Sequence, residues 1–596
     1  MKSNRRILSI LCILMTLAML SMSVLAGAAD TMFVQLPDLS SYYKDKDIDD
    51  TFEDDKAVHI VLTGTDWLAD NENGFSCEDQ VLTITTKGTY VLSGTWNGQI
   101  RVQVPEEDKV HLILNGVTVE SPEGPAILEL TSDKLIVTVQ EGTENTLVCR
   151  TAVTDDDDTI GGALYAEDDL SINGTGILNA VSEVAHGIQS KADLILSGAT
   201  LNVTSAKDGI RGRNSVLILS GTLNIAAQGD GICSTRTDKE GKGYVILAGG
   251  TVQITTGSGA GQVTASAENQ NRNRGMNTKT SSSESDVSQK GIKAATDLYV
   301  LDGTLTLNCA DDALHAVRVT LASGTMTIRS GDDAVHADED LTILDGTIRI
   351  EQCYEGLEGT NVTILGGQID IVSSDDGVNA SGGSDMSGFG GRDQFGSWGR
   401  RSGQNPAQSN TSGSTGAGAT QTDSAVAGFL SIQGGQLSVI SGGDALDANG
   451  SLAITGGSVA VYAATTGGEG AIDFNGTGTI SGGTLMVASS GGIMTDTAGL
   501  TGQTIMSIPL SSRLSAGTTL ELFTGDGSLL SSLTLSQTCD TLLISSDQLP
   551  EGSLCSVAGN STTLFSGTVT ASSLAGSGAW GGGFGGGGFG GGGHRH

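Results

Sequence analysis

Aromatic, proline and basic residues are all scarce in this chain. Aromatics make up 4% of the 596 residues, fewer than a conventional globular core would normally use, and proline occurs only 7 times. Lysine and arginine number 31 against 68 acidic residues, which gives a net charge of −37. Nucleic-acid binding is excluded, because it needs a basic surface. Cations are favoured partners, and an acidic polymer could bind only through bridging cations or a local basic patch.

Long apolar runs are absent beyond the N-terminus. Residues 1–28 combine three basic residues, an apolar stretch over 7–20 and a small-residue cleavage pattern, which predicts a secretory signal peptide. No later run of about 20 apolar residues predicts a membrane span. We therefore expect a protein outside the cell, either free or associated with the cell surface, and a monomer is favoured.

Cysteines do not form a disulfide framework. Seven follow the signal segment, in an odd and scattered set without zinc-site spacing. We expect most of them to be small buried residues. Cys539 and Cys555 could pair, and the sequence leaves this open.

Glycine, by contrast, is abundant (87 residues), and one phrase recurs roughly every 22 residues between about 160 and 490. The residues 324–337, 346–359 and 367–380 are three successive copies. Each copy reads as two short alternating strands and a shorter third strand separated by turns. Three strands per repeat predict an all-β right-handed parallel β-helix, in which each coil pairs with its neighbours at about 4.8 Å. Leucine-rich, left-handed β-helix and nonapeptide repeats do not fit the spacing.

The domain organisation follows from where this pattern starts and stops. We predict an acidic, solvated leader over 29–57, the β-helix over 58–500, a small C-terminal β cap over 501–574 and a flexible glycine-rich tail over 575–596. Two low-complexity insertions, 257–288 and 381–427, interrupt the coils. They flank the same short third strand, which favours a functional role for that edge.

The third strands carry the candidate functional residues. Aligning the copies places an acidic residue before this strand at nearly every level, and it often follows a second acid. The resulting ladder consists of Asp208, Asp230, Asp311, Asp312, Asp332, Asp333, Asp375, Asp376 and Asp444. The run at 155–158 is interpreted as a solvated loop.

Calcium is the cofactor that this ladder predicts. Two carboxylates about 5 Å apart repel by roughly 3 kcal/mol at an effective dielectric near 20, so a row of them needs compensation. Ca²⁺ binds six to eight oxygens in flexible geometry, whereas Mg²⁺ requires tighter octahedra. For any single copy we favour a different interpretation, in which the acid merely hydrogen-bonds turn amides. For the whole ladder we favour calcium.

Other side chains on the same edge are candidates for sugar contacts, although the histidines could instead bind metal or hydrogen-bond neighbouring acids. They are Tyr354, Glu355, Glu358, His315 and His336.

Several phrases resemble a known family. Gly88–Thr95, Leu112–Val117, Glu141–Leu147, Asp208–Gly212 and Tyr354–Glu358 occur in the order seen in secreted bacterial carbohydrate-binding domain-containing β-helix proteins, and the resemblance spans about 58–500. It implies a calcium-bearing β-helix, similar to pectate lyases, that binds polysaccharide without established catalysis. The family's calcium ligands would fall on the Asp-Asp turns. Lys290 and Lys293 interrupt the acidic file, and so does the coil of Glu355 and Glu358, which puts calcium at those two levels in question.

Two functions from different classes therefore stand beside a structural or adhesion role. The first is a non-catalytic module that binds plant cell-wall or acidic polysaccharide. The second is a calcium-dependent pectate-type lyase, in which a basic residue removes a proton acidified by calcium. Candidate bases are Lys293, Lys290 and Arg211, with Arg213 close by in sequence; they could equally be counter-charges for the acids.

Overall fold

The computed structural model describes residues 34–151, 153–154, 159–261, 287–381, 428–462, 470–490 and 499–572. The predicted signal peptide, the run at 155–158, nearly all of both insertions and the glycine-rich tail lie outside the described residues. Residues 34–44 belong to a separate compact unit, in which Asp38 caps the 3-10 helix η1 (Leu39–Ser41). The second unit, from Asp45 onward, contains every strand of the described residues.

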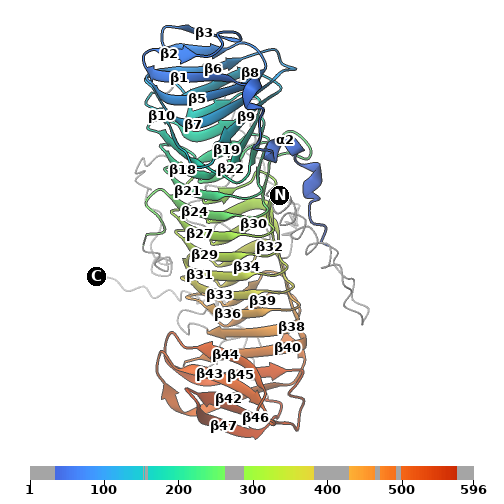
Figure 1. Ribbon diagram of the computed structural model, residues 1–596. Helices are drawn as coiled ribbons and strands as arrows, with labels where there is room; N and C mark the ends of the chain where they lie inside the picture. Colours follow the sequence, from blue (N-terminus) through green and yellow to red (C-terminus); the bar gives the residue numbers. More distant parts are fainter. Residues whose placement is uncertain are drawn as a thin grey trace, which may run out of the picture. The chain divides into compact units, whose positions relative to one another are not determined.

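This second unit is a parallel β-helix, as the 22-residue period predicts (Figure 1). Each coil contributes one strand to each of three parallel stacks. The first stack is β7 (Lys109–Ser121), β9 (Lys134–Val139), β14 (Asp169–Gly174), β17 (Asp193–Leu196), β20 (Ser215–Ile218), β23 (Tyr244–Leu247), β26 (Asp297–Val300), β28 (Leu314–Leu321), β30 (Val335–Ile343), β32 (Leu357–Ile364), β35 (Phe429–Ile432), β38 (Ser451–Tyr462) and β40 (Gly478–Ser489).

The second stack shares the long strands β7, β38 and β40 with the first. Its other members are β10 (Glu144–Cys149), β15 (Ile177–Ser182), β18 (Thr200–Ser205), β21 (Thr222–Ala227), β24 (Thr251–Thr256), β27 (Thr304–Cys309), β29 (Thr325–Ser330), β31 (Thr347–Cys353), β33 (Gln368–Ser373) and β36 (Gln436–Ile440).

The third stack is the one on which the predicted site lies. It includes the first part of β28, β30 and β32, because in these coils the third strand runs on into the first strand of the next coil. Its other members are β4 (Val81–Ile84), β6 (Gln99–Gln103), β8 (Ile127–Thr131), β13 (Gly162–Ala166), β16 (His186–Ser190), β19 (Ile210–Gly212), β22 (Ile232–Ser234), β25 (Ile292–Lys293), β34 (Val378–Ala380), β37 (Leu446–Ala448) and β39 (Ile472–Phe474).

The core runs through the inside of the coils. Inward-facing residues of the third stack are fully buried at every repeated level: Ile210, Ile232, Ile292, Leu314, Val335, Leu357, Val378 and Leu446. Burying an aliphatic side chain of this size contributes about 1.5–3 kcal/mol, so the file favours one register, because a slip by one residue would point every member outward.

Glycine follows the acidic residue at several levels where the backbone of the next coil lies close. A Cβ added at Gly209 would lie 2.6 Å from the carbonyl oxygen of Gly231, and one at Gly377 would lie 2.6 Å from that of Ala445. These contacts disfavour a side chain at Gly209 and Gly377, whereas Ala313, Ala334 and Ala445 occupy the same position in other coils.

At the N-terminal side, β1 (Val58–Gly64) and β5 (Gly88–Trp96) extend the parallel stacking. β2 (Trp67–Ala69) pairs antiparallel with β1, and β3 (Phe75–Glu78) pairs antiparallel with β4. A separate antiparallel pair joins β11 (Val153–Thr154) to β12 (Thr159–Ile160).

Antiparallel strands follow the last coils. β41 (Leu500–Gly502) pairs with β40 in parallel, whereas β45 (Cys539–Ser546) pairs antiparallel with both β40 and β42 (Ile505–Leu514). A four-stranded antiparallel sheet follows, in the order β44 (Leu529–Thr534), β43 (Thr519–Thr524), β46 (Leu554–Gly559) and β47 (Thr562–Thr568). The predicted fold class, a right-handed parallel β-helix with a small C-terminal β cap, is confirmed. Cys539 and Cys555, for which pairing was left open, are both free and buried.

The expectation that residues 29–57 are solvated is wrong at Asp47. This residue lies in the one-turn helix α2 (Asp45–Ile48) and is 1% exposed. Its carboxylate pairs with Lys134 Nζ at 2.7 Å and accepts a hydrogen bond from Ser171 Oγ at 2.7 Å. The ion pair compensates the desolvation of the buried carboxylate. The 3-10 helix η2 (Asp54–Lys56) precedes β1. None of the described helices is long and apolar enough to cross a membrane.

Candidate functional site

Two files of side chains follow the third stack, and together we call them the acidic edge. The turn file stands just before each third strand: Asp208, Asp230, Lys290, Asp312, Asp333, Glu355, Asp376 and Asp444. The strand file points outward from the strands themselves: Arg211, Cys233, Lys293, His315, His336, Glu358, Asn379, Asp447 and Asp473. Consecutive members lie in adjacent coils, so residues 21 to 68 positions apart in sequence become neighbours.

Five turn-file aspartates accept a backbone hydrogen bond from the next coil with one carboxylate oxygen. Asp208 Oδ1 accepts from the backbone N–H of Asp230 at 3.0 Å, and Asp230 Oδ1 accepts from that of Lys290 at 2.9 Å. The same bond joins Asp312 to Asp333 at 3.2 Å, Asp333 to Glu355 at 3.3 Å, and Asp376 to Asp444 at 2.6 Å. Part of the acidic ladder therefore consists of aspartates that accept hydrogen bonds from turn N–H groups, which is the interpretation preferred for any single copy.

In the earlier coils the second oxygen meets a basic group. Asp208 Oδ2 lies 3.2 Å from His186 Nδ1 and 3.2 Å from Arg211 Nη1. Burial alone would raise the pKa of Asp208, but these two neighbours hold it below its ordinary value. Arg211 therefore acts as a counter-charge, one of the two roles the sequence left open for it.

Lys290 fills the acidic position of its own coil with a buried cation. Its ammonium pairs with Asp312 Oδ2 and lies 3.2 Å from Asp311 Oδ1, and its side chain is only 2% exposed. Although burial raises the pKa of Asp312, Lys290 and His315 bring it well below the usual range. Lys290 therefore acts as a counter-charge for Asp311 and Asp312. Lys293, in the strand file, donates from Nζ to Ser288 Oγ at 3.3 Å.

The last coils replace basic groups with acids. Here the strand file continues as Asn379, Asp447 and Asp473. Ligand oxygens of Asp444, Asp447 and Asp473 all lie within 4.8 Å of one another. Burial and the charges of Asp375, Asp444 and Asp447 raise the pKa of Asp376 to about 9. A cation bound between the carboxylates would relieve this repulsion directly, because they could all act as its ligands.

Four further groups on the acidic edge could hold a metal ion, because within each group the metal-binding atoms lie within 4.8 Å of one another. They are Asp311, Asp312 and Asp332; Asp208, Asp230 and Cys233; Asp312, His315 and His336; and Asp333, His336 and Glu358. Burial and the charge of Asp208 raise the pKa of Asp230 to about 6. The Cys233 thiol is buried and its pKa is raised, so it is a poor thiolate ligand at neutral pH.

Four of the five residues predicted to contact sugar are buried. Tyr354 is 8% exposed, Glu355 3%, Glu358 7% and His315 1%. His336 is 20% exposed by its side chain and is the most accessible of the five. Their surfaces leave little area for a stacked sugar ring, so their assignment to glycan binding stays a prediction.

Sequence reasoning missed two acids of this edge. Asp473 aligns with Asp447 one coil beyond the last clean repeat, and continuing the alignment through Ile472 would have found it. Asp338 lies within 3.6 Å of His336 Nε2 and 3.9 Å of His315 Nε2. It follows the third strand rather than preceding it, so the Asp-Asp pattern gives no signal for it.

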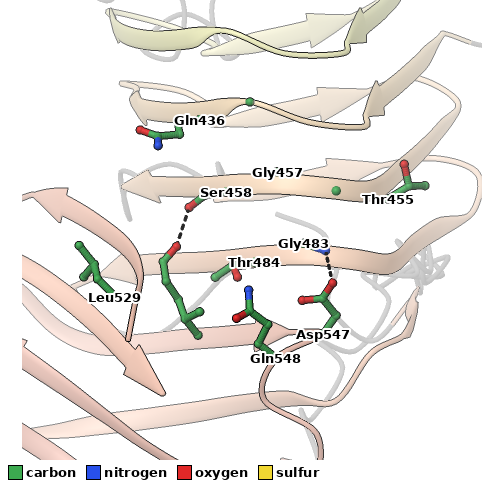
Figure 2. A pocket seen from close by; sticks show the side chains of 12 residues that line it. Gln436, Thr455, Gly457, Ser458, Gly483, Thr484, Leu529, Asp547 and Gln548 are labelled. Carbon is green, nitrogen blue, oxygen red and sulfur yellow. Dashed lines mark hydrogen bonds between the residues drawn. The ribbon is translucent and has the colours of Figure 1, made fainter. Parts of the chain in front are cut away.

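A separate pocket has a volume of about 420 Å³ (Figure 2). It is bordered by turns of β36, β38 and β40 and by residues of the C-terminal region. Ser458 Oγ donates to Leu530 O at 3.2 Å, and Gly483 N–H donates to Asp547 Oδ2 at 3.2 Å. Among the described residues that line it, none was predicted to bind metal or sugar and none is aromatic.

Comparison with known proteins assigns the chain to a family. The family model described as "Carbohydrate-binding domain-containing protein" matches residues 78–320 and 317–392, more than half of the chain. A carbohydrate-binding domain-containing protein from Acetivibrio thermocellus is 37% identical over 204 residues, which cover 34% of this chain and 71% of that protein. The chain belongs to this carbohydrate-binding domain family.

One solved structure is also similar. It is a gadolinium derivative of the polysaccharide lyase-like protein from C. thermocellum, with a TM-score of 0.37 and 23% sequence identity. The similarity covers 48% of this chain and 96% of that one.

Proposed function

We propose that this protein is secreted and binds acidic polysaccharide without cleaving it, through calcium ions held on the C-terminal part of the acidic edge. Membership of the carbohydrate-binding domain family supports the ligand class. The observation that carries the calcium proposal is the concentration of acids at Asp375, Asp376, Asp444, Asp447 and Asp473, where the strand file has no basic member.

The donor chemistry of this group fits calcium. All of its side-chain donors are carboxylate oxygens, the ligands that hard divalent cations prefer. The carboxylates also crowd together, since a Cβ added at Gly443 would lie 2.4 Å from Asp376 Oδ1 and 2.5 Å from Asp375 Oδ1. Flexible coordination suits such an irregular set better than the strict octahedron of Mg²⁺.

Calcium would also explain how so acidic a chain binds an acidic glycan. With a net charge of −37, the protein repels a polyuronate unless a cation lies between them. A calcium ion held by two or three aspartates keeps coordination positions that glycan carboxylates can occupy. The buried positions of Lys290 and Asp312 support binding rather than β-elimination, because a paired, buried ammonium is poorly placed to act as a base.

Affinity electrophoresis in gels containing polygalacturonate tests this proposal. We expect retardation with millimolar Ca²⁺, loss of retardation with chelator, and at least about a tenfold weaker affinity for Asp444→Asn/Asp447→Asn, because two ligands are lost. Asp340→Asn is the matched control, since that carboxylate belongs to the first stack, where it accepts from Asn361 Nδ2.

Three results would contradict the proposal. Retardation that is indifferent to chelator removes calcium from the binding step. Absence of binding to any glycan favours a structural or adhesion role. Release of unsaturated uronate product, lost in Lys293→Ala, favours the lyase.

A further inference from the structure

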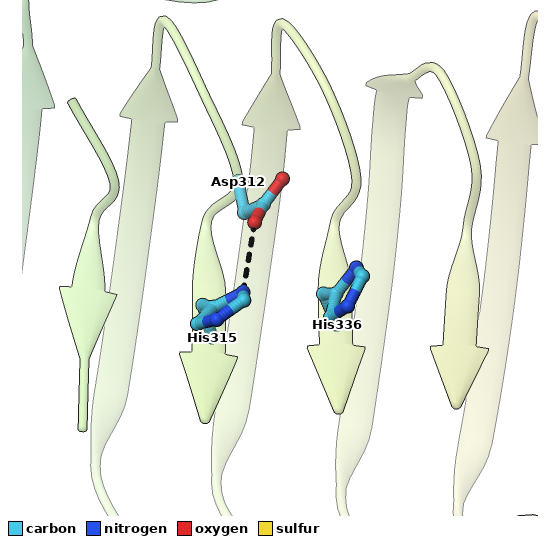
Figure 3. Close-up of side chains that lie close together, drawn as sticks. All are labelled: Asp312, His315 and His336. Atoms are coloured by element: carbon cyan, nitrogen blue, oxygen red, sulfur yellow. Dashed lines mark hydrogen bonds and ion pairs between the residues drawn. The ribbon is translucent and has the colours of Figure 1, made fainter. Parts of the chain in front are cut away.

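Nitrogen donors interrupt the oxygen ligands in the middle of the acidic edge. His315 on β28 and His336 on β30 are neighbours in register, and their rings stack with centroids 4.8 Å apart and planes inclined by 27° (Figure 3). His315 Nδ1 lies 3.0 Å from Asp312 Oδ2, and His336 Nδ1 lies 3.0 Å from Asp333 Oδ2. Imidazole is a ligand for zinc and related transition metals, whereas calcium takes oxygen.

The surroundings of the two rings differ in charge. The oxygen that His315 faces, Asp312 Oδ2, is already shared with the ammonium of Lys290. His336 Nδ1 instead faces two carboxylates, because Glu358 Oε2 lies 2.5 Å from it in addition to Asp333 Oδ2. A dication is therefore attracted to His336 and repelled from the Lys290 side of His315.

We propose that His336, Asp333 and Glu358 bind one divalent metal ion of the zinc class, separate from the calcium positions of the last coils. The metal would take the place of the hydrogen on His336 Nδ1. Donor atoms of the three residues all lie within 4.8 Å of one another. His336 Nδ1 lies 3.0 Å from Asp333 Oδ2 and 2.5 Å from Glu358 Oε2, so these pairs need to separate by about 0.3 Å and about 0.8 Å to reach about 3.3 Å, the edge of a tetrahedron with metal–ligand bonds of about 2.0–2.1 Å.

An unpartnered amide oxygen one coil further on supports a ligand at this place. Asn379 is 3% exposed and pairs in register with Glu358. Its Nδ2 donates to Glu355 Oε2 at 2.9 Å, while Oδ1 is buried without a hydrogen-bond partner among the described residues. A buried acceptor without a donor is costly. Water on the open position of a zinc-class ion would supply that donor.

The second imidazole and an acid on the far side complete the surroundings. Asp338 Oδ1 faces Nε2 of both rings, at 3.6 Å from His336 and 3.9 Å from His315. A carboxylate behind a metal-binding imidazole orients the ring and makes it a stronger ligand. The site would cross-link the coils that contain Asp333, His336 and Glu358. It does not depend on the proposed glycan binding.

Co²⁺, whose tetrahedral complexes absorb visible light, is the probe for the test. The full chain is stripped with chelator, supplied with millimolar Ca²⁺ to fill oxygen-only sites, and titrated with Co²⁺ and then Zn²⁺. We expect one equivalent of Co²⁺ to give the visible band and one equivalent of Zn²⁺ to remove it. His336→Gln and Glu358→Gln should each weaken Co²⁺ binding at least about tenfold.

His186→Gln is the matched control, because His186 Nδ1 also faces an aspartate, Asp208, but that aspartate is shared with Arg211. Its Co²⁺ affinity should equal that of the unaltered chain. The terminal His594 and His596 are present in every variant, so they cannot produce a difference. The proposal is overturned if the unaltered chain binds no Co²⁺, if excess Ca²⁺ displaces it, or if folded His336→Gln and Glu358→Gln bind as tightly as the unaltered chain.

Discussion

Replacing Lys290 with methionine should destabilise the protein by about 3–5 kcal/mol, although the two side chains are of similar size. Lys290 is almost completely buried, and its ammonium neutralises Asp311 and Asp312. Its removal leaves a buried carboxylate without its counter-charge, which costs far more than the ion pair itself contributes. Urea unfolding of the calcium-free protein, followed by circular dichroism, measures the loss.

Two controls separate charge from packing. Lys293→Met should cost about 1 kcal/mol or less, because Lys293 stands in the partly accessible strand file. Lys290→Met combined with Asp312→Asn should recover most of the lost stability, since the unpaired charge is then gone. Calcium should also restore part of it, because Asp311, Asp312 and Asp332 would then resemble the coils that lack a basic group. Equal losses for Lys290→Met and Lys293→Met would contradict the assignment of Lys290 as a built-in cation.

Asp376→Asn should change stability in opposite directions without and with calcium. In the metal-free protein, burial and neighbouring acids raise the pKa of Asp376 to about 9 from an ordinary 3.8. The folded state then binds more protons than the unfolded state between these values, so stability falls as the pH rises from about 4 to about 9. The variant avoids this loss and should be more stable at pH 7 by on the order of a few kcal/mol.

With calcium the sign reverses, because the variant lacks one ligand oxygen that the ion would use. Its gain in melting temperature on adding Ca²⁺ should be smaller than that of the unaltered chain. Asp370→Asn is the control, since Asp370 lies on β33 in the second stack and pairs in register with Arg349. Melting curves at pH 5 and 7, with chelator and with calcium, measure all four states. A variant that is less stable under every condition would exclude this explanation.

Much of the fold could be predicted because the apolar residues that recur with the 22-residue period are also the residues that are buried. Buried residues such as Ile210, Leu314 and Val378 recur at one phrase position, and only one coil register keeps all of them inside. The same register brings Asp312 and Asp333 together, so the existence of an acidic edge followed from the repeat. The antiparallel C-terminal strands were recognisable from alternation without the repeat.

The chemistry of the edge was less predictable, because it depends on side chains one coil apart. The pattern could not show that Asp312 uses one oxygen for the next backbone N–H and the other for Lys290 and His315. Nor could it show that Asp47 is buried, because its partner Lys134 lies 87 positions away in sequence. From local composition alone, an acidic segment is expected to be solvated, and only knowledge of a distant basic partner would change that expectation.

The charge of the side chains on the acidic edge therefore changes from the earlier coils to the last ones. Arg211, Lys290 and Lys293 neutralise the earlier coils, His315 and His336 occupy the middle, and only acids and one asparagine follow in the strand file. This order divides one continuous file into a segment that carries its own cations and segments that we propose to recruit metal ions.

Calcium titration of the chelator-treated, unaltered protein, read by thermal melting and by calorimetry, tests the central claim most directly. We expect saturable binding and a melting temperature that rises with free Ca²⁺, since a ligand that binds only the folded state stabilises it by mass action. Mg²⁺ at the same concentration should raise it less. A melting temperature that is the same in chelator and in millimolar calcium, without binding heat, would contradict the account.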